Sequence, residues 1–467
     1  MPPRKTIEVK SPFDGTVVGT VPAASAEGIE DAARAAVAGH ARWREAPAHV
    51  RGAALRRAAE AVRDRREALA RTIALESGKT IREARAEADR CEHTLRTSGE
   101  EAVRIGGEAI QYDGAPHGEG RHAVVRRFPV GPVLAITPFN FPLNLPAHKV
   151  GPALAAGDGI LLKPSEKTPL AALALADALA SAGLGEVSPL AVLVCERESA
   201  GALVGDPRFA LVSFTGSPDV GWRIKAAAGR ARVVLELGGN AGVVVHEDAD
   251  LPLAAERCVA GAFAVAGQSC ISVQRILLHE RIADAFLREF LPRVRALRTG
   301  DPLDEATDVG PLIDGAAASR VQAWIREAIA AGARPLQGRG ERSGNVVEPT
   351  VLADVRRDLP LYCREAFGPV AAVETYSDFE EALARVDASD YGLQAGVFTN
   401  DVERIHRAFE RLEVGAVLAN EVPTYRYDPA PYGGVKGSGL GREGIRSAIE
   451  HMTEPRLLVV TRPRRRG

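Results

Sequence analysis

Cysteine is scarce in this sequence, and its arrangement argues against two common roles. Only five of the 467 residues are cysteines, and no two of them form a CxxC pair; they are Cys91, Cys195, Cys258, Cys270 and Cys363. The odd number and wide spacing do not fit a disulfide framework or a cysteine-based metal site, so we expect neither. A single cysteine usually packs as a small hydrophobic residue, so a chemical role needs support from its surroundings.

The sequence also lacks a strong net charge and a long hydrophobic run. Its formal net charge is −2, which gives no strong field to attract nucleic acid or an anionic membrane. No apolar run approaches the roughly 18 residues of a membrane span, and no hydrophobic segment follows the basic start of "MPPRKTIEVKSPFDG". We therefore expect a cytoplasmic protein with neither nucleic acid nor membrane as a partner.

Hydrophobic patterning predicts an α/β protein. Residues 6–22 predict a hairpin, and Ala/Arg/Glu-rich segments after the capping residue Ser25 predict three helices, the second and third over about 48–75 and 79–105. From 132 onward, short apolar strands alternate with helices in two stretches, the second beginning near 241, which is typical of parallel sheets covered on both faces. Turn residues within 109–130 predict a projecting hairpin, and "EPRLLVVTRP" predicts a final strand.

Several polar or glycine-rich strings follow the predicted strands, at the ends where ligands bind in open α/β sheets. In "ITPFNFPLN", Asn140 can donate to a developing oxyanion or satisfy the backbone of a turn. In "LLKPSEKTP", Lys163 and Glu166 can bind ribose hydroxyls or lie in an exposed loop. In "SFTGSPDVG", the turn at Gly216-Ser217 can hold a pyrophosphate, but such turns are common.

Three further strings carry acidic or nucleophilic side chains. Glu236 ends an apolar strand in "LELGGN", where burial would raise its pKa toward that of a general base, unless a cation pairs with it. Cys270 in "GQSC" follows small residues that leave room for a substrate at the thiol. Glu365 and Phe367 in "REAFGPV" can hold a second ribose and a flat ring, or cap a helix and fill a core. The glycine-rich stretch 431–444 predicts mobile or closely packed backbone.

Together these strings resemble the aldehyde dehydrogenase superfamily over nearly the whole chain. The resemblance rests on "FNFP", "LELGGN", "GQSC" and "EAFGPV", on their order, and on the 34 residues from Glu236 to Cys270. It implies that Cys270 attacks the aldehyde carbon, and that Asn140 with the backbone N–H of Cys270 holds the oxyanion. Loss of a hydride to a nicotinamide would give a thioester, which water activated by Glu236 would hydrolyse.

The resemblance also implies a site for NAD, with NADP as an open alternative. Ser217 would bind the pyrophosphate, Glu365 the nicotinamide ribose, and Phe367 would lie beside the nicotinamide ring. Glu166 would bind the adenine-side ribose with Lys163; it favours NAD because a carboxylate repels a 2′-phosphate, while Lys163 keeps NADP open. The implied cofactor ligands are Thr137, Pro138, Phe139, Lys163, Glu166, Gly216, Ser217, Glu365 and Phe367.

The fold implied by the resemblance has three parts. A Rossmann-like cofactor domain would comprise 1–108 and 132–238, and an α/β catalytic domain would comprise 239–440. A small β oligomerisation element would combine 109–131 with 450–467, and homodimers or homotetramers are usual in the family. Exposed strand edges would favour association here too.

Within the superfamily, "GQSCISVQRI" and "NEVPTYRYDPAPYGGVKGSG" are most similar to the lactaldehyde-dehydrogenase-like branch, which implies a small hydroxyaldehyde or semialdehyde as substrate. Ser269 counts against a phosphorylated substrate, since some phosphate-aldehyde members carry arginine there. Arg426 can bind a carboxylate or be an ordinary surface arginine. The expected substrate-pocket residues are Asn144, Ser269, Ile271, Tyr425 and Arg426.

Two rival hypotheses remain at this point. A CoA-acylating member of the superfamily would release the thioester to CoA, but Glu236 fills the position of the hydrolytic base and argues against it. A catalytically silent protein with the same fold would bind NAD without reacting. The full set of expected catalytic groups, Cys270, Asn140 and Glu236, argues against this second rival.

Overall fold

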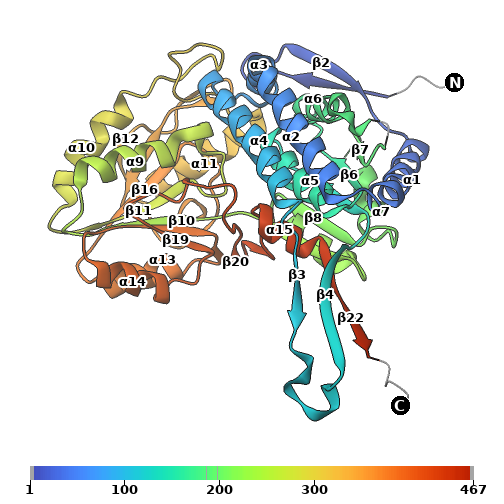
Figure 1. Ribbon diagram of the computed structural model, residues 1–467. Helices are drawn as coiled ribbons and strands as arrows, with labels where there is room; N and C mark the ends of the chain where they lie inside the picture. The colour runs from blue at the N-terminus through green and yellow to red at the C-terminus, as the bar shows by residue number, and fades with distance from the viewer. Residues whose placement is uncertain (1–4, 186, 197, 463–467) are drawn as a thin grey trace, which may run out of the picture.

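The computed structural model describes residues 5–185, 187–196 and 198–462, and it has two α/β lobes and a slender arm (Figure 1). The lobes are built on mainly parallel sheets of six and seven strands, and the arm is a three-stranded antiparallel sheet. This architecture agrees with the predicted α/β class. Among the described residues, no helix is both long and apolar enough to cross a membrane.

The first sheet has the strand order of a dinucleotide-binding fold. Its parallel strands run β7-β6-β5-β8-β9, which is 3-2-1-4-5 in chain order, and β21 pairs antiparallel with β9 at the edge. The order reverses between β5 and β8, and ligands bind beyond the carboxyl ends of the strands at such a point. The strands are β5 (Val133–Ile136), β6 (Ile160–Lys163), β7 (Leu190–Val192), β8 (Leu211–Thr215), β9 (Arg232–Glu236) and β21 (Gly439–Leu440).

The N-terminal region forms the predicted hairpin, β1 (Thr6–Lys10) with β2 (Val17–Pro22), and then helices. The single helix predicted over 48–75 is wrong: α2 (Ala48–Asp64) and α3 (Arg66–Ser77) are separated at Arg65, whose backbone (φ −102°, ψ 11°) leaves the helical conformation. Apolar spacing continues across this break and therefore does not reveal it. The flanking helices are α1 (Ala26–Trp43), which Ser25 caps, and α4 (Ile81–Glu101), which begins with a capping box.

Helix α5 (Asn144–Ala156) lies at the centre of the first lobe. All of its residues are buried, and it packs against α4 and against α15 (Ile445–His451). Three of those residues, Asn144, His148 and Lys149, are polar, so they need partners inside the protein. The other helices of this lobe include α6 (Leu170–Leu179) and α8 (Pro218–Ala227).

The second sheet runs β12-β15-β16-β11-β10-β18-β19 and is parallel except for β12. Its strands are β10 (Ala241–Val245), β11 (Val273–His279), β12 (Arg334–Gln337), β15 (Thr350–Ala353), β16 (Val370–Tyr376), β18 (Gln394–Phe398) and β19 (Ala416–Ala419). Its helices include α9 (Leu251–Phe263), α10 (Ala283–Arg295), α11 (Gly315–Ala330), α13 (Phe379–Asp387) and α14 (Val402–Arg411).

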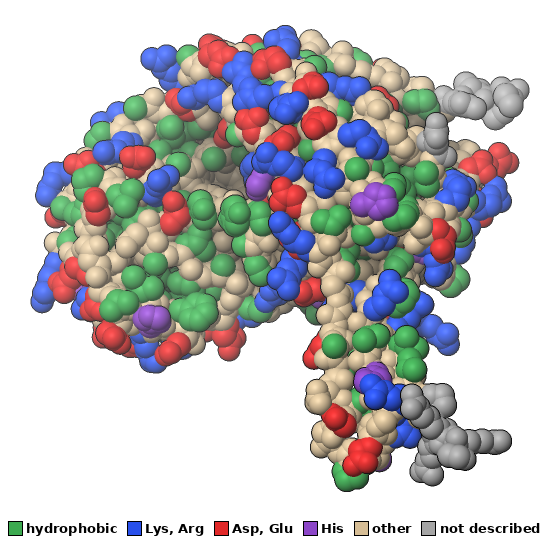
Figure 2. Space-filling view, viewed as in Figure 1, with side chains coloured by type: hydrophobic (Ala, Val, Ile, Leu, Met, Phe, Trp, Pro, Cys, Tyr) green, Lys and Arg blue, Asp and Glu red, His purple; other side chains and the backbone are tan. Residues whose placement is uncertain are grey.

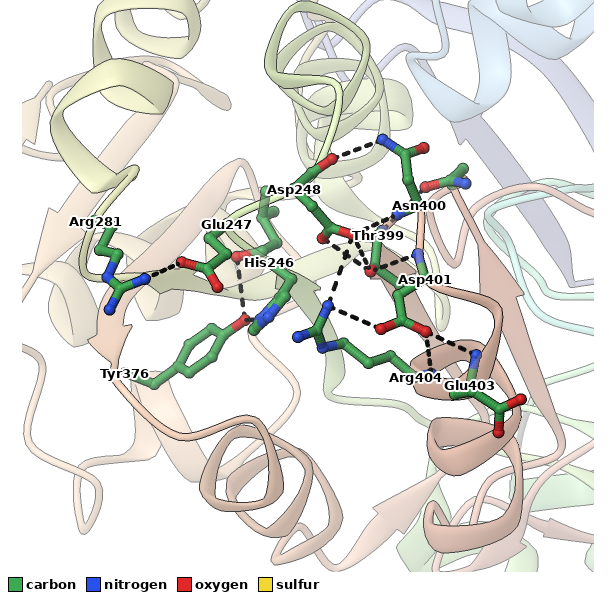
Figure 3. A network of polar contacts seen from close by, with 12 residues as sticks. His246, Glu247, Asp248, Arg281, Tyr376, Thr399, Asn400, Asp401, Glu403 and Arg404 are labelled. Carbon is green, nitrogen blue, oxygen red and sulfur yellow. Dashed lines mark hydrogen bonds and ion pairs between the residues drawn. The ribbon is translucent and has the colours of Figure 1, made fainter.

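A polar network closes the carboxyl edge of this second sheet (Figure 3). Beyond β10, His246 Nδ1 lies 2.9 Å from the hydroxyl of Tyr376 at the end of β16. Beyond β18, the Thr399 hydroxyl donates to Asp248 Oδ1 over 2.8 Å, and Asp401 caps α14. These side chains hydrogen-bond to one another across the strand ends, so the polar groups at this edge of the sheet serve to hold the strand ends together.

The arm consists of the predicted hairpin and the predicted final strand. β22 (Thr453–Thr461) pairs antiparallel with β4 (Arg121–Pro129) along its whole length, and β3 (Gly107–Ile110) pairs with the other edge of β4. The arm projects from the body of the protein and carries hydrophobic side chains on its surface (Figure 2). On β22, Leu457 and Leu458 are more than half exposed, at 53% and 58%.

The glycine-rich stretch 431–444 is closely packed and links the two lobes. β20 (Val435–Lys436) pairs with β17 (Tyr391–Gly392) of the second lobe, and a few residues later β21 pairs with β9 of the first. A Cβ atom at Gly439 would lie 2.4 Å from the carbonyl oxygen of Leu235, so the contact leaves no room for a side chain. β21 therefore joins the first sheet, although its residues lie within the range predicted for the catalytic domain. The predicted domain boundaries stay a prediction. Their terminal residues 1–4 and 463–467 lie outside the described residues.

Candidate active site

A cavity of about 660 Å³ lies between the two sheets, and Figure 2 shows a hollow where the lobes meet. The cavity brings together every predicted site residue except Tyr425. The lining includes Thr137, Pro138, Phe139, Asn140, Asn144, Lys163, Glu166, Gly216, Ser217, Glu236, Ser269, Cys270, Ile271, Glu365, Phe367 and Arg426.

Tyr425 is 57% exposed, and the structure does not place it in the cavity. The neighbouring residues Thr424 and Arg426 line the cavity, whereas Tyr427 is also exposed. In an extended segment, successive side chains point to opposite sides, so the inward position of Arg426 sends both tyrosines outward.

The two lobes contribute opposite ends of their strands. Asn140 follows β5, Ser217 follows β8, and Glu236 ends β9, all at the carboxyl edge of the first sheet. Cys270 instead precedes β11, so it lies at the amino edge of the second sheet. The rule that ligands bind at the carboxyl ends of strands therefore applies to the first lobe. The second lobe contributes the Cys270 thiol from the amino ends of its strands.

The backbone ahead of Cys270 is held in a strained left-handed turn. Val265, Ala266 and Gly267 have φ values of 54°, 53° and 70°, a conformation that residues with a Cβ rarely adopt. Glu83 of α4 holds this turn by accepting the N–H of Val265 over 2.6 Å. A Cβ at Gly267 would lie 2.0 Å from the carbonyl oxygen of Gly368, so only glycine fits there.

Asn140 lies beside the cysteine loop. Its Nδ2 donates to the carbonyl oxygen of Gln268 over 2.9 Å, two residues before Cys270. Asn140 is only 7% exposed, and its Oδ1 makes no hydrogen bond to the described residues. An amide nitrogen carries two hydrogens, so Nδ2 keeps one donor for a second acceptor near the thiol.

Glu236 is buried and makes no hydrogen bond through either carboxyl oxygen within the described part of the chain. Burial, together with the nearby Glu443 carboxylate, raises the pKa of Glu236 well above its usual value. Burial also opposes ionisation of Glu443, but Lys149 and Arg426 outweigh it and lower the pKa of Glu443 to about 2. Two neighbouring carboxyl groups thus differ in charge state.

A cluster of charged side chains, all buried except the half-buried Arg90, surrounds these carboxyl groups. Lys149 Nζ lies 2.8 Å from Glu443 Oε1, and Arg426 Nη2 lies 3.2 Å from Glu443 Oε2. Arg90 donates to Asp428 through Nε and Nη2 at 3.0 and 2.6 Å, and Asp428 also lies 3.5 Å from Arg426 Nε. Arg426 is therefore no surface arginine; its side chain is 8% exposed and lines the cavity.

The cofactor side of the cavity has features that fit a dinucleotide. Ser217 is the N-cap of α8, where free N–H groups face an anion, and its side chain makes no capping bond. Lys163 and Glu166 form an ion pair of 3.3 Å beyond β6. Glu365 Oε1 accepts the N–H of Gly239 over 2.9 Å. Burial raises the pKa of Glu365 to about 7, although this hydrogen bond and the charge of Arg320 both act to lower it.

Two aromatic rings line the same region. Phe139 and Phe367 meet edge to face with centroids 6.0 Å apart, and Phe367 adopts a left-handed backbone with φ 47°. Strain of this kind collects where a side chain must take a defined position. The two rings therefore offer an apolar wall against which a flat heterocycle can pack.

Sequence reasoning missed three residues that shape the site. Glu83, Tyr432 and Glu443 come from segments far from Cys270, and the Tyr432 hydroxyl lies 3.2 Å from Cys270 Sγ. Tyr432 and Glu443 lie within the glycine-rich stretch, whose close packing was one of two predicted alternatives. Glu83 belongs to a capping box, so the local sequence indicates only the start of a helix and gives no sign of the hydrogen bond from Val265 to Glu83.

Comparison with known proteins gives a consistent result. A family model described as the aldehyde dehydrogenase family matches residues 1–458. A 3-sulfolactaldehyde dehydrogenase of Priestia aryabhattai is 45% identical over 87% of this chain and 85% of that protein. A lactaldehyde dehydrogenase of Methanococcus aeolicus is 37% identical over 98% and 97% of the two chains.

Solved structures agree in fold along the whole chain. Aldehyde dehydrogenase 21 of Physcomitrella patens, in complex with the reaction product succinate, superposes with a TM-score of 0.96 and 41% identity, covering 99% of this chain and 96% of that chain. Similar solved structures also include complexes with NADP. The Rossmann-like α/β fold and the resemblance to the lactaldehyde branch are thereby confirmed.

The strained turn gives a stability prediction. Gly267→Ala adds a Cβ at positive φ and drives it into the Gly368 carbonyl, so we expect a loss of about 2–4 kcal/mol in the free energy of unfolding. The matched control is Gly229→Ala, at φ 57° with nothing within 4 Å of the added Cβ, which should lose about 1 kcal/mol. Urea unfolding followed by circular dichroism measures both, and equal losses would contradict the close approach.

Proposed function

As a member of the aldehyde dehydrogenase family, the protein is an NAD(P)-dependent aldehyde dehydrogenase, and we propose that it oxidises a small anionic aldehyde to the acid through a thioester on Cys270. One observation carries this proposal: Cys270, Asn140 and Glu236, which lie at or near the ends of separate strands of two sheets, line one cavity. A thiol, an amide donor and a carboxyl base are what acyl transfer through a covalent intermediate requires.

In the first step, the Cys270 thiolate adds to the aldehyde carbon and the carbonyl oxygen becomes an oxyanion. The second hydrogen of Asn140 Nδ2 and the backbone N–H of Cys270 donate to that oxygen. Since Asn140 is already fixed by Gln268, its donor is aligned before the charge develops. Preorganised donors of this kind stabilise the transition state more than water does.

NAD or NADP fits the cofactor side of the cavity, and when bound it supplies the oxidant that accepts the hydride of the adduct. Ser217 and the start of α8 would hold the pyrophosphate, Lys163 and Glu166 the adenine-side ribose, and Glu365 the nicotinamide ribose. We assign a preference for NAD, because the Glu166 carboxylate accepts from a 2′-hydroxyl and repels a 2′-phosphate.

Glu236 is assigned the hydrolytic step. Its raised pKa makes it a stronger base than an exposed carboxylate, and both of its oxygens are free of hydrogen bonds to the described residues. In its ionised form, Glu236 would take a proton from the water that attacks the thioester. This role separates the proposal from the CoA-acylating alternative, and the complete set of catalytic groups argues against a silent protein.

The substrate assignment follows from charge. The cluster holds three cations, the buried Lys149 and Arg426 and the half-buried Arg90, against two anions, Asp428 and Glu443, which leaves one positive charge. Glu236 does not cancel it, because burial favours its neutral form. Relatives act on sulfolactaldehyde, and one similar structure binds succinate. A semialdehyde with a carboxylate therefore suits this wall better than a neutral hydroxyaldehyde.

We also assign oligomerisation to the arm. The exposed side chains of Leu457, Leu458, Val459 and Val460 along β22 form an apolar strip that covers both faces of this strand of the arm. β22 is an edge strand of the arm, and among the described residues no strand pairs with its outer edge, so another chain can pair there. A second copy of this chain is the occupant that a homo-oligomeric family implies.

The catalytic assignment predicts a separation of the two chemical steps. Glu236→Gln removes the base but keeps the shape, so we expect a single-turnover burst of NADH and then a steady rate lowered about 10²–10⁴-fold. Stopped-flow absorbance with succinic semialdehyde and NAD measures both phases. Cys270→Ala should give no burst. Turnover restored to Glu236→Gln by CoA would favour the acylating alternative.

The charge assignment predicts selective loss with Arg90→Met. The ratio of kcat/KM for succinic semialdehyde over butanal should fall about 10–100-fold, the value of one charge-assisted hydrogen bond, while butanal oxidation changes little. Arg96→Met on the same helix is the matched control, because Arg96 is exposed and is not among the cavity-lining residues. An unchanged ratio would remove Arg90 from the substrate site.

The arm assignment predicts a change in mass. Leu458→Arg places a charge in the apolar strip, so the assembly measured by light scattering after gel filtration should become smaller. Phe409→Arg on α14, at a residue that is 67% exposed, should leave the mass unchanged. A wild-type protein that is monomeric at micromolar concentration would contradict the assignment.

A further inference from the structure

Tyr432 has a contact that the proposed mechanism does not use. Its hydroxyl oxygen lies 3.2 Å from Cys270 Sγ, and the residue is 7% exposed in the wall of the cavity. Its backbone is fixed by two hydrogen bonds with Glu443, one in each direction, at 3.0 and 2.6 Å. The position of the hydroxyl is therefore set by the same stretch of chain that supplies Glu443.

The ring of Tyr432 is held from the other side by Arg426. The guanidinium carbon of Arg426 lies 3.7 Å from the ring centroid, a stacked cation–π contact inside the protein. Burial and the nearby Cys270 raise the pKa of Tyr432 well above its usual value. The phenol consequently keeps its proton at working pH and can act as a donor.

The thiol of Cys270 needs such a donor. Burial raises its pKa above the usual value of a thiol, and the carboxyl groups of Glu365 and Glu236 act in the same direction. The hydrogen bond with Tyr432 and the charge of Arg426 act in the opposite direction. Among these neighbours, Tyr432 alone makes direct hydrogen-bond contact with the sulfur.

We propose that Tyr432 is a positioning residue that donates its O–H to the Cys270 thiolate before the aldehyde binds, and so stabilises the reactive form of the nucleophile. The thiol proton leaves to water in the cavity, Sγ takes the negative charge, and the phenol retains its own proton. Once Sγ has bonded to the aldehyde carbon, the sulfur is no longer anionic and the bond weakens. This inference rests on the proposed role of Cys270 as the nucleophile.

Alkylation of Cys270 tests the proposal without any aldehyde. Iodoacetamide reacts with the thiolate, so the pH profile of the alkylation rate reports the pKa of the thiol. A Cys363→Ser background removes the exposed cysteine, and the remaining Cys91, Cys195 and Cys258 are buried. The modified peptide is quantified by mass spectrometry in the parent protein, in Tyr432→Phe and in Tyr427→Phe.

Tyr432→Phe removes one hydroxyl but keeps the ring under Arg426. One hydrogen bond to a charged group corresponds to about one to two pH units, so the midpoint should move up by that amount and alkylation near neutral pH should slow about 10–100-fold. Tyr427, which is 57% exposed, provides the matched loss of a hydroxyl, and its variant should keep the parent midpoint.

Three outcomes are distinguishable. A raised midpoint in Tyr432→Phe alone, with unchanged thermal melting, supports the proposal. An unchanged midpoint overturns the proposal even if turnover falls, because a residue that only packs the site would lower turnover without moving the pH profile. A parent protein whose Cys270 resists alkylation at every pH overturns the proposed function itself, and the inference with it.

Discussion

The ionised state of Glu443 is the constraint on which the site depends. Lys149 and Arg426 hold one negative charge on this buried carboxylate, and burial together with that charge disfavours a second negative charge on Glu236. The same ion pair orients Arg426, whose guanidinium stacks on Tyr432, and Tyr432 reaches Cys270. A carboxyl group with a raised pKa, a fixed cation and a positioned thiol thus all depend on one buried anion. Buried pairs of this kind add little to stability, and their value here is that they fix charge states.

The sequence predicted the strands and the motif residues of the site, because each depends on neighbours close in the chain. Cys270, Asn140 and Glu236 were found from short strings, and the cavity contains all three. Other features depend on contacts that no local pattern encodes. The break at Arg65 interrupts a continuous apolar spacing, and Glu83 reaches Val265 across 182 positions of sequence.

The loop around Arg426 shows the same limit on a smaller scale. Three large side chains, Tyr425, Arg426 and Tyr427, follow one another, and composition gives no reason to choose which of them faces inward. The choice was decided by Glu443 and Asp428, whose charges lie 3.2 and 3.5 Å from Arg426. The local sequence, an arginine between two tyrosines, is typical of a surface loop, and only the folded structure shows the two anions that hold Arg426 inside.

The two lobes supply different groups to the cavity, so the glycine-rich stretch that links the lobes affects the geometry of the site. Glu236 ends a strand of the first sheet and Cys270 precedes a strand of the second, so the distance between the Glu236 carboxyl group and the Cys270 thiol is set by how the lobes meet. Residues 435–440 pair with β17 of one lobe and with β9 of the other, and Gly439 lies directly opposite Glu236 in that pairing. A side chain at Gly433 would come within 2.7 Å of a Glu236 carboxyl oxygen. Small residues there let the connecting chain run against the Glu236 carboxyl group, so the segment that joins the lobes also brings Tyr432 and Glu443 into the wall of the cavity.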